Sequence, residues 1–281
     1  MVVRRRYKEM EVSQIMSEPV TIDKDQRLSY ALELLDKKRV DRLIVADDGA
    51  VRGILTYADI ADRLGVSKVV AVSVVRLHIS SAMTDTVITV SPKDDVTEVA
   101  QLMIERGMSG CPVVDEKDKL VGVISKKELS ALVEKFEDVK VEDLMTKENL
   151  LVVNPVERLV KARLEMLDRG YSGLPVVDGS RVLGLLTERA VAEAMARFST
   201  EVPDKYRRNQ VRQIRVVDAM IQQPPMVGPD DSVSEAIKKM ADANLNTLPV
   251  VAKGNKLVGI ISTTDFTRFV ANKFKIPEKG E

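Results

Sequence analysis

The residues whose spacing suits polar chemistry are hydroxyls followed three positions later by an acid. Thr56 precedes Asp59 and Ser262 precedes Asp265, in each case where an apolar stretch gives way to a polar one. A hydroxyl at such a place is typical of a helix N-cap, and an acid in the first turn is favoured by the helix dipole. The carboxylate can equally accept hydrogen bonds from a polar ligand. Helix capping and ligand binding therefore both remain open for these pairs.

Other chemistries are excluded by what the sequence lacks. Cys111 and His78 are the only residues of their types, which rules out a disulfide framework and clustered Cys or His metal sites. The sequence has no phosphate-binding P-loop, no GxGxxG motif and no Cys/His nucleophile pair, so we expect no enzyme activity and no metal. Lys and Arg number 43 and Asp and Glu number 43, a balance that argues against a general polyanion binder.

The remaining composition indicates a cytoplasmic protein. No stretch approaches the ~18–20 apolar residues of a membrane span, and the basic N-terminus has no apolar region behind it that would make a secretory signal. The basic segments 4–7 and 205–215 are more simply a solvated arm and linker than nucleic-acid contacts. We therefore expect neither a membrane nor a nucleic-acid partner.

The hydroxyls belong to an internal repeat that predicts the elements around them. Four segments end in methionine, at 12–16, 79–83, 141–145 and 216–220, and each is followed by a short β-rich stretch and an apolar pattern of helical period. Two strands come next, the second of which begins with glycine and ends in the hydroxyl, at 53–56, 122–125, 184–187 and 259–262. The sequence thus predicts four β-α-β-β-α units, an α+β fold, over residues 12–64, 79–134, 141–197 and 216–271.

The linkers indicate how the units pair. About nineteen residues of mixed charge, 197–215, separate units three and four, and an apolar segment, 65–78, joins units one and two. The junction at 134–140 is short and charged, as at a domain edge. Because one unit alone buries little core, we expect units one and two to form one module and units three and four another.

These motifs resemble the cystathionine β-synthase (CBS) domain, from about Val12 to Val270. Four copies are similar to the regulatory gamma subunit of AMP-activated protein kinase and its archaeal stand-alone relatives. The resemblance implies two modules assembled into a disc, with AMP, ADP or ATP bound in clefts between paired units. It also implies that the Ser/Thr and the Asp hold the ribose, whose vicinal hydroxyls a carboxylate can accept together.

The resemblance assigns residues to two competent clefts, because Glu128 makes the second unit's site doubtful and Ala190 leaves the third without a carboxylate. The cleft of the first unit combines Thr56, Ala58 and Asp59 with Thr84, Ile88, Met108, Ser109 and Pro112. The cleft of the fourth unit combines Ile260, Ser262, Thr264 and Asp265 with Thr146, Val152, Tyr171, Ser172 and Pro175. Phosphates are expected to meet Lys127 and Arg189, and then Arg42. The positions of the gamma subunit's phosphate-contacting histidines hold Asp41, Ser109, Ser172 and Asn246, so its phosphate-number preference is not carried over.

The function implied is that of a non-enzymatic sensor of adenosine nucleotides, and so of energy state. It would act on an effector protein through ligand-dependent rearrangement of its modules. Two alternatives stay open: an assembly module with vestigial clefts, and a sensor of another adenosyl ligand such as S-adenosylmethionine. A homodimer also stays open.

Overall fold

The computed structural model describes residues 10–65, 72–136 and 138–272, so the basic segment 4–7 lies outside the described residues. The first unit contains η1 (Val12–Gln14), β1 (Thr21–Ile22), α2 (Leu28–Lys38), β2 (Arg42–Asp47), β3 (Ala50–Thr56) and α3 (Tyr57–Gly65). After η2 (Val74–Arg76), the second unit contains η3 (Ile79–Ser81), α4 (Val96–Glu105), β4 (Gly110–Val114), β5 (Leu120–Ser125) and α5 (Lys126–Val133).

The second half of the chain repeats this order. The third unit contains α6 (Val141–Leu144), α7 (Leu159–Asp168), β6 (Gly173–Asp178), β7 (Arg181–Thr187) and α8 (Glu188–Glu201). The expected linker forms α9 (Asp204–Gln210) and η4 (Val211–Gln213). The fourth unit contains η5 (Val216–Asp218), β8 (Ile221–Gln222), α10 (Val233–Ala243), β9 (Thr247–Ala252), β10 (Lys256–Ser262) and α11 (Thr263–Ala271). No helix of the described residues is long and apolar enough to cross a membrane.

The helices α4, α5, α8 and α10 begin at capping side chains that the sequence provides. In α10, Ser232 accepts a hydrogen bond from the Glu235 amide at 3.1 Å, and Asn244 takes the left-handed conformation that ends the helix. Between these caps the apolar residues recur on one buried face, as the helical period of the sequence predicts.

The leading strand of each unit is shorter than the sequence predicts. In the first unit β1 pairs in parallel with β2 over two residues. In the other three units the stretch makes a single parallel bridge to the hairpin, at Val90, Val153 and Val227. The chain touches the hairpin edge at one residue there and then turns toward the next helix, so the β-rich stretch predicts a longer strand than the one that forms.

The segment after each methionine crosses to the neighbouring unit and pairs with its second hairpin strand. Thr84 exchanges two backbone hydrogen bonds of 2.9 Å with Ile54, and Ser17 bridges Val123 in return. The second module repeats the exchange: Thr146 bridges Ile260, and β8 pairs with β7. Strand exchange therefore joins unit one to unit two and unit three to unit four.

The methionines and glycines of the repeat meet in this exchange. A Cβ atom added to Gly122 would lie 2.6 Å from Sδ of Met16, and one added to Gly184 would lie 2.6 Å from Sδ of Met220. Gly53 and Gly259 are covered in the same way by Met83 and Met145. The glycine is thus needed because the partner unit's methionine packs directly on the backbone.

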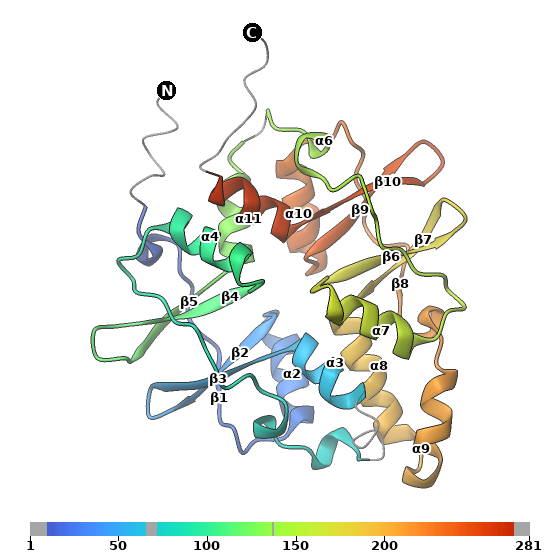
Figure 1. The fold of residues 1–281 in the computed structure, drawn as a ribbon, viewed down its shortest axis with the longest axis horizontal. Helices are drawn as coiled ribbons and strands as arrows, with labels where there is room; N and C mark the ends of the chain where they lie inside the picture. Colours follow the sequence, from blue (N-terminus) through green and yellow to red (C-terminus); the bar gives the residue numbers. More distant parts are fainter. Residues whose placement is uncertain (1–9, 66–71, 137, 273–281) are drawn as a thin grey trace.

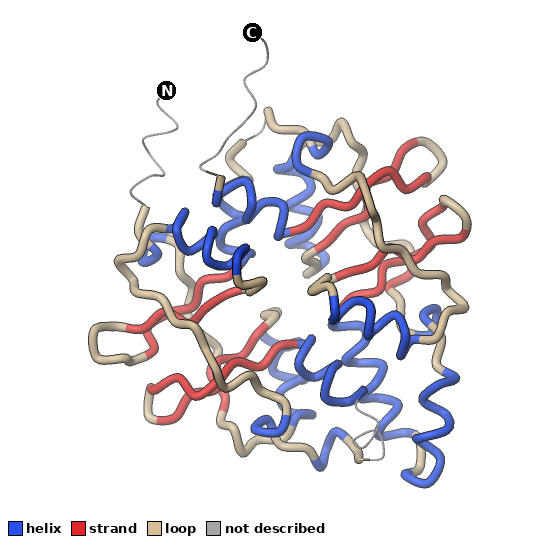
Figure 2. Tube along the Cα trace, in the orientation of Figure 1, coloured by secondary structure: helices blue, strands red, loops and turns tan. Residues whose placement is uncertain are grey.

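The hydrophobic cores follow a different pairing from the strands. Among the described residues one core joins units one and three, where α3 packs on α8, and another joins units two and four, where α5 packs on α11. The four units therefore close into a ring in the order one, two, four, three (Figure 1). Strand hairpins point outward on two sides of the ring and helices gather on the other two (Figure 2). Two modules of paired CBS-type units thus form the expected disc.

Candidate ligand-binding clefts

The two predicted hydroxyl–carboxylate pairs form capping boxes. Oδ2 of Asp59 accepts hydrogen bonds from the Thr56 amide at 2.7 Å and the Thr56 hydroxyl at 2.6 Å. Oδ2 of Asp265 accepts the same pair from Ser262, at 2.8 and 2.7 Å. One oxygen of each carboxylate therefore caps its helix, which bears out the capping interpretation without using the second oxygen.

The second oxygen of each carboxylate faces the neighbouring unit. Oδ1 of Asp59 accepts a hydrogen bond from the Thr84 hydroxyl at 3.2 Å, and Oδ1 of Asp265 accepts one from Thr146 at 3.3 Å. Both donors stand directly after the exchanged methionine. Strand exchange thus places a hydroxyl of one unit against a carboxylate of the next.

Glu128 of the second unit adopts the same arrangement despite its longer side chain. Its Oε2 accepts hydrogen bonds from the amide and hydroxyl of Ser125, and its Oε1 accepts one from the Ser17 hydroxyl at 2.9 Å. The extra methylene is therefore absorbed within the capping box.

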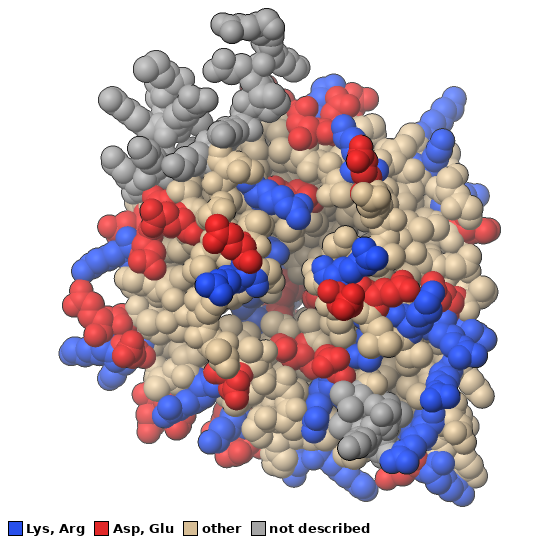
Figure 3. All heavy atoms as spheres, viewed as in Figure 1, with Lys and Arg blue, Asp and Glu red and all other residues tan. Residues whose placement is uncertain are grey.

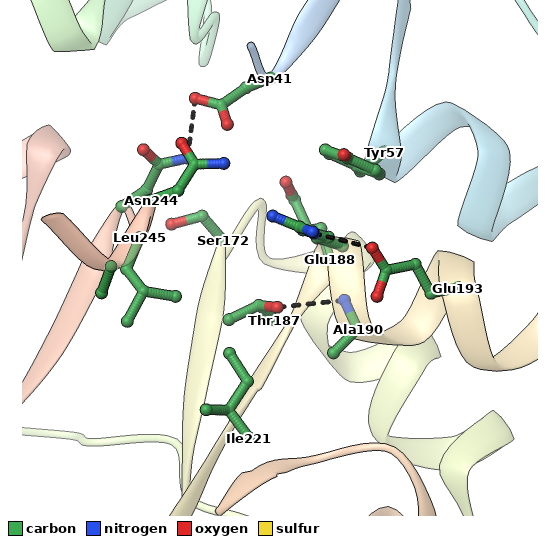
Figure 4. Close-up of a pocket in the computed structure, with 13 residues that line it drawn as sticks. Asp41, Tyr57, Ser172, Thr187, Glu188, Ala190, Glu193, Ile221, Asn244 and Leu245 are labelled. Atoms are coloured by element: carbon green, nitrogen blue, oxygen red, sulfur yellow. Dashed lines mark hydrogen bonds and ion pairs between the residues drawn. The ribbon is translucent and has the colours of Figure 1, made fainter. Parts of the chain in front are cut away.

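The third unit lacks both partners. Thr187 caps its helix by accepting a hydrogen bond from the Ala190 amide at 3.1 Å, and the residue after the exchanged methionine is Ile221 (Figure 4). The hydroxyl–carboxylate contact of the other three clefts is here replaced by two apolar side chains.

A cavity of about 390 Å³ surrounds Asp265. Of the residues expected there it is lined by Thr146, Tyr171, Ser172, Ile260, Ser262, Thr264 and Asp265. Val152 and Pro175 do not line it. Further parts of the wall come from Leu150, Leu151, Arg169 and Arg268. The second unit, which belongs to the other module, contributes Ile104 and Lys126.

The residues expected around Asp59 do not all line one cavity. Thr56, Ala58, Ser109, Arg42 and Lys127 line a cavity of about 200 Å³ that also takes residues from the third and fourth units. Asp59 and Thr84 themselves do not line that cavity. Ile88, Met108 and Pro112 do not line it either: Ile88 is 37% exposed, Met108 packs against the core of units two and four, and Pro112 is buried in β4. Figure 3 shows a hollow near the middle of the disc face with both acidic and basic side chains around it.

The two cations expected to meet phosphate are already paired within the protein. Nζ of Lys127 lies 3.0 Å from a carboxylate oxygen of Asp41 and 2.9 Å from Oδ1 of Asn244. Arg189 forms ion pairs with Asp36 and Glu193. Arg42 is 9% exposed, and one of its guanidinium nitrogens would lie within 2.3 Å of a Cβ added to Gly110.

Lys126 is the cation that the sequence reasoning missed. It lines both the Asp265 cavity and the central cavity, and it donates a hydrogen bond to the Thr264 hydroxyl at 3.0 Å. Burial, with help from the positive charges of Arg42 and Arg268, lowers the pKa of this ammonium to about 8. Burial also raises the pKa values of the Asp59 and Asp265 carboxyls above their ordinary value.

The signal that could have identified Lys126 is its position in the repeat. The residue directly after the hydroxyl is Tyr57, Lys126, Glu188 or Thr263 in the four units, and each is the first residue of its helix. All four line the cavities around the middle of the disc. Sequence reasoning chose instead the next position, where Lys127 and Arg189 stand. Among the described residues, no group of three or more Asp, Glu, His or Cys side chains could hold a metal ion.

Comparison with known proteins places these clefts in context. The sequence matches the model of the CBS domain family over residues 12–66, 78–135, 141–197 and 211–272. It is 24% identical to the uncharacterized protein MJ1225 of Methanocaldococcus jannaschii over 268 residues, which are 90% of this chain and 95% of that protein. The crystal structure of MJ1225, a proposed archaeal homologue of g-AMPK, matches with a TM-score of 0.80 at 20% identity and covers 92% of this chain and 99% of that one.

Two further matches differ in extent. The structure of an uncharacterized conserved protein from Pyrococcus horikoshii matches with a TM-score of 0.60 at 22% identity, over 93% of this chain and all of that one (100%). Inosine-5'-monophosphate dehydrogenase of M. jannaschii is 40% identical over 106 residues, which are 37% of this chain and 21% of that enzyme. The two structural matches share the fold, whereas the sequence match to the enzyme is confined to a fifth of its length.

Proposed function

Since this chain belongs to the CBS domain family, matched in all four repeats, we propose that it is a non-catalytic regulatory protein that binds adenosine nucleotides. The expected relation to archaeal relatives of the gamma subunit is confirmed by the match to MJ1225. The observation that carries the proposal is the cavity around Asp265, because it combines a buried carboxylate with the half-buried ammonium of Lys126.

Each part of a nucleotide would have a counterpart in this cavity. Oδ1 of Asp265, which also accepts a hydrogen bond from Arg268 at 3.0 Å, would accept the ribose hydroxyls in place of its longer contact with Thr146. Leu150, Leu151 and Ile260 offer an apolar wall for adenine. Lys126 and Thr264 would donate to the 5′-phosphate. The volume of about 390 Å³ falls within the range of small-molecule sites.

The same cavity suggests how binding would be reported. Its carboxylate belongs to the module of units three and four, whereas Lys126 belongs to the module of units one and two. A nucleotide that contacts the Asp265 carboxylate with its ribose and Lys126 with its phosphate would stabilise the arrangement of modules in which these two side chains lie close together. The size of the effect would equal the difference in affinity between that arrangement and others. An effector protein that contacts both modules would sense the difference.

The Asp59 cleft is proposed as the second principal site. The Asp59 carboxylate also caps its helix with one oxygen and accepts a hydrogen bond from a threonine of the neighbouring unit, Thr84, with the other. Its donor side, Lys127, is paired with Asp41, so we expect this cleft to respond less to the number of phosphates.

Calorimetric titration tests the proposal directly. AMP and ATP should bind the wild-type protein at about two sites, and Asp265→Ala should remove one and leave the other within a few-fold in affinity. Loss of the acceptor for both hydroxyls costs roughly 1–3 kcal/mol, which is about ten- to hundred-fold in affinity. Asp59→Ala is the matched control and should remove the other site.

Three outcomes would redirect the assignment. Binding of S-adenosylmethionine but not of AMP or ATP would make this a sensor of another adenosyl ligand. No heat with any adenosyl ligand would favour an assembly module. Two unchanged sites in both Asp→Ala variants would show that the carboxylates do not hold the ligand.

A further inference from the structure

The cleft of the third unit has a different chemical character from the other three. Where the others hold a hydroxyl against a carboxylate, this cleft holds Ile221 and Ala190 (Figure 4). The replacement affects both members of the pair, which come from different units. A cavity of about 250 Å³ remains beside them, and Leu245 and Ala243 extend its apolar wall. Ile221 and Ala190, which replace the hydroxyl and the carboxylate of the other clefts, do not fill this space.

The polar side of the same cavity contains polar groups without hydrogen-bond partners. The carboxylate of Glu188 has no hydrogen bond or ion pair among the described residues. The phenol oxygen of Tyr57, a side chain that is 4% exposed, also has no partner there, and neither does Oδ1 of Asn246. The orientation of the Asn246 amide is set by its NH₂ group, which donates to Asp41 at 3.2 Å. A ligand completing this wall must therefore supply donors to Glu188 and Asn246, whereas the Tyr57 hydroxyl can either donate or accept.

The charges around the cavity favour a positive ligand. Arg189 is neutralised by Asp36 and Glu193, and Asp41 is paired with Lys127. Of the charged residues described in the lining of this cavity, Glu188 is the one without an ion-pair partner. Burial is the largest cause that raises the pKa of Glu188; Asp41 and Asp59 raise it further, whereas Lys126 and Arg42 lower it, so these four side chains are within electrostatic reach.

We propose that this cleft binds a small organic cation: an ammonium or guanidinium head on an apolar body. The head donates hydrogen bonds to the Glu188 carboxylate, and the body lies against Ile221, Ala190 and Leu245. A nucleotide is disfavoured here because no carboxylate receives its ribose and Glu188 repels its phosphate. The proposal is independent of nucleotide binding at Asp265, since the two cavities share one residue, Ser172.

The probe is 2-phenylethylammonium, with phenylacetate as the anion of similar shape and methylammonium as the head without the body. We expect calorimetry at pH 8 to show one site for 2-phenylethylammonium, no binding of phenylacetate, and at least about tenfold weaker binding of methylammonium. Glu188→Gln should weaken 2-phenylethylammonium by about ten- to hundred-fold through loss of a charge-assisted hydrogen bond. Glu116→Gln removes an exposed charge of β4–β5 and should change nothing.

The outcomes are separable from those of the nucleotide titration. Retained 2-phenylethylammonium binding in Asp265→Ala, whatever happens to AMP, supports a separate cation site. Unchanged affinity in Glu188→Gln, with the variant melting as a folded protein, would overturn it. Binding of phenylacetate as strong as that of the cation, or displacement of the cation by AMP in Asp59→Ala/Asp265→Ala, would do the same.

Discussion

The ammonium of Lys126 lies 3.0 Å from the hydroxyl of Thr264, and this one hydrogen bond connects the two modules beside the Asp265 carboxylate. The lysine is the first residue of α5 and the threonine is the second residue of α11, two helices that pack on each other. A ligand phosphate at this point would contact both modules at once.

Lys126→Met tests that contact. If the phosphate meets Lys126, ATP and AMP should bind about ten- to hundred-fold more weakly, because a charge-assisted hydrogen bond contributes roughly 1.5–3 kcal/mol. Adenosine should bind as before. Lys127→Met is the matched control and should have the smaller effect, since that charge is held by Asp41. Equal weakening of adenosine and ATP would contradict a phosphate contact and indicate a structural role.

Glu188 makes the stability of the protein depend on pH. Burial is the largest cause that raises its pKa from 4.5 to about 7, so between these values the folded protein holds a proton that the unfolded chain has lost. Its contribution to stability therefore falls as the pH rises from 4.5 to 7. Glu188→Gln removes this penalty, so its gain in melting temperature over wild type should be near zero at pH 4.5 and a few degrees at pH 8. A gain that is the same at both values would contradict the shifted pKa.

The fit of methionine on glycine predicts a specific loss of stability. A Cβ atom at Gly53 would lie 2.8 Å from the carbonyl oxygen of Thr84 and 3.1 Å from Sδ of Met83. Gly53→Ala should cost roughly 1–3 kcal/mol, seen as a fall in melting temperature. Gly228→Ala is the control, because its Cβ would meet nothing nearer than 3.5 Å. Equal melting of the two variants would show that the exchanged segment adapts without cost.

We expect removal of the buried guanidinium group of Arg163 to cost more stability than removal of the exposed one of Arg52. It is buried between α7 and α3, and its Nη1 donates to the carbonyl oxygens of Ala61 and Asp62 at 3.2 and 3.3 Å. Arg163→Met would leave these acceptors unpaired and should cost roughly 1–3 kcal/mol. Arg52→Met, which removes an exposed ion pair with Asp47, should cost about 0–1 kcal/mol by thermal denaturation. A larger loss for Arg52 would contradict this account of the interface.

The repeat made the unit predictable, because its signals are local. Capping hydroxyls and helical periodicity each report on a few neighbouring residues, and both appear in the structure. The second strand of each hairpin also forms, but it begins two or three residues before the glycine that was predicted to start it. The pairing of units one and three was not accessible in this way. Each of the helices α3, α5, α8 and α11 buries one face, and a periodic apolar pattern does not indicate which helix meets which. Their partners are decided only when the ring closes.

The candidate site was accessible only in part for a related reason. Asp265 and Thr146 could be assigned because the resemblance to the CBS domain applies to the same positions of every unit. Lys126 reaches the same cavity across the module interface, and no spacing in the sequence reports on that distance. Lys127 was the natural choice by position, but its contact with Asp41 depends on a residue of another unit that the linear sequence does not place beside it.

The exchange of methionine segments also bears on how such a chain could arise and be divided. A single unit separated from its neighbour would lose the methionine that covers its glycine and the segment that pairs with its hairpin edge. Duplication of the gene in whole pairs of units preserves these contacts, whereas duplication of one unit would break them. Recombination at residues 134–140 leaves both products with complete exchanges. Each product would then expose the helical faces of α3 and α5, or of α8 and α11, and a second pair, identical or different, would be needed to cover them.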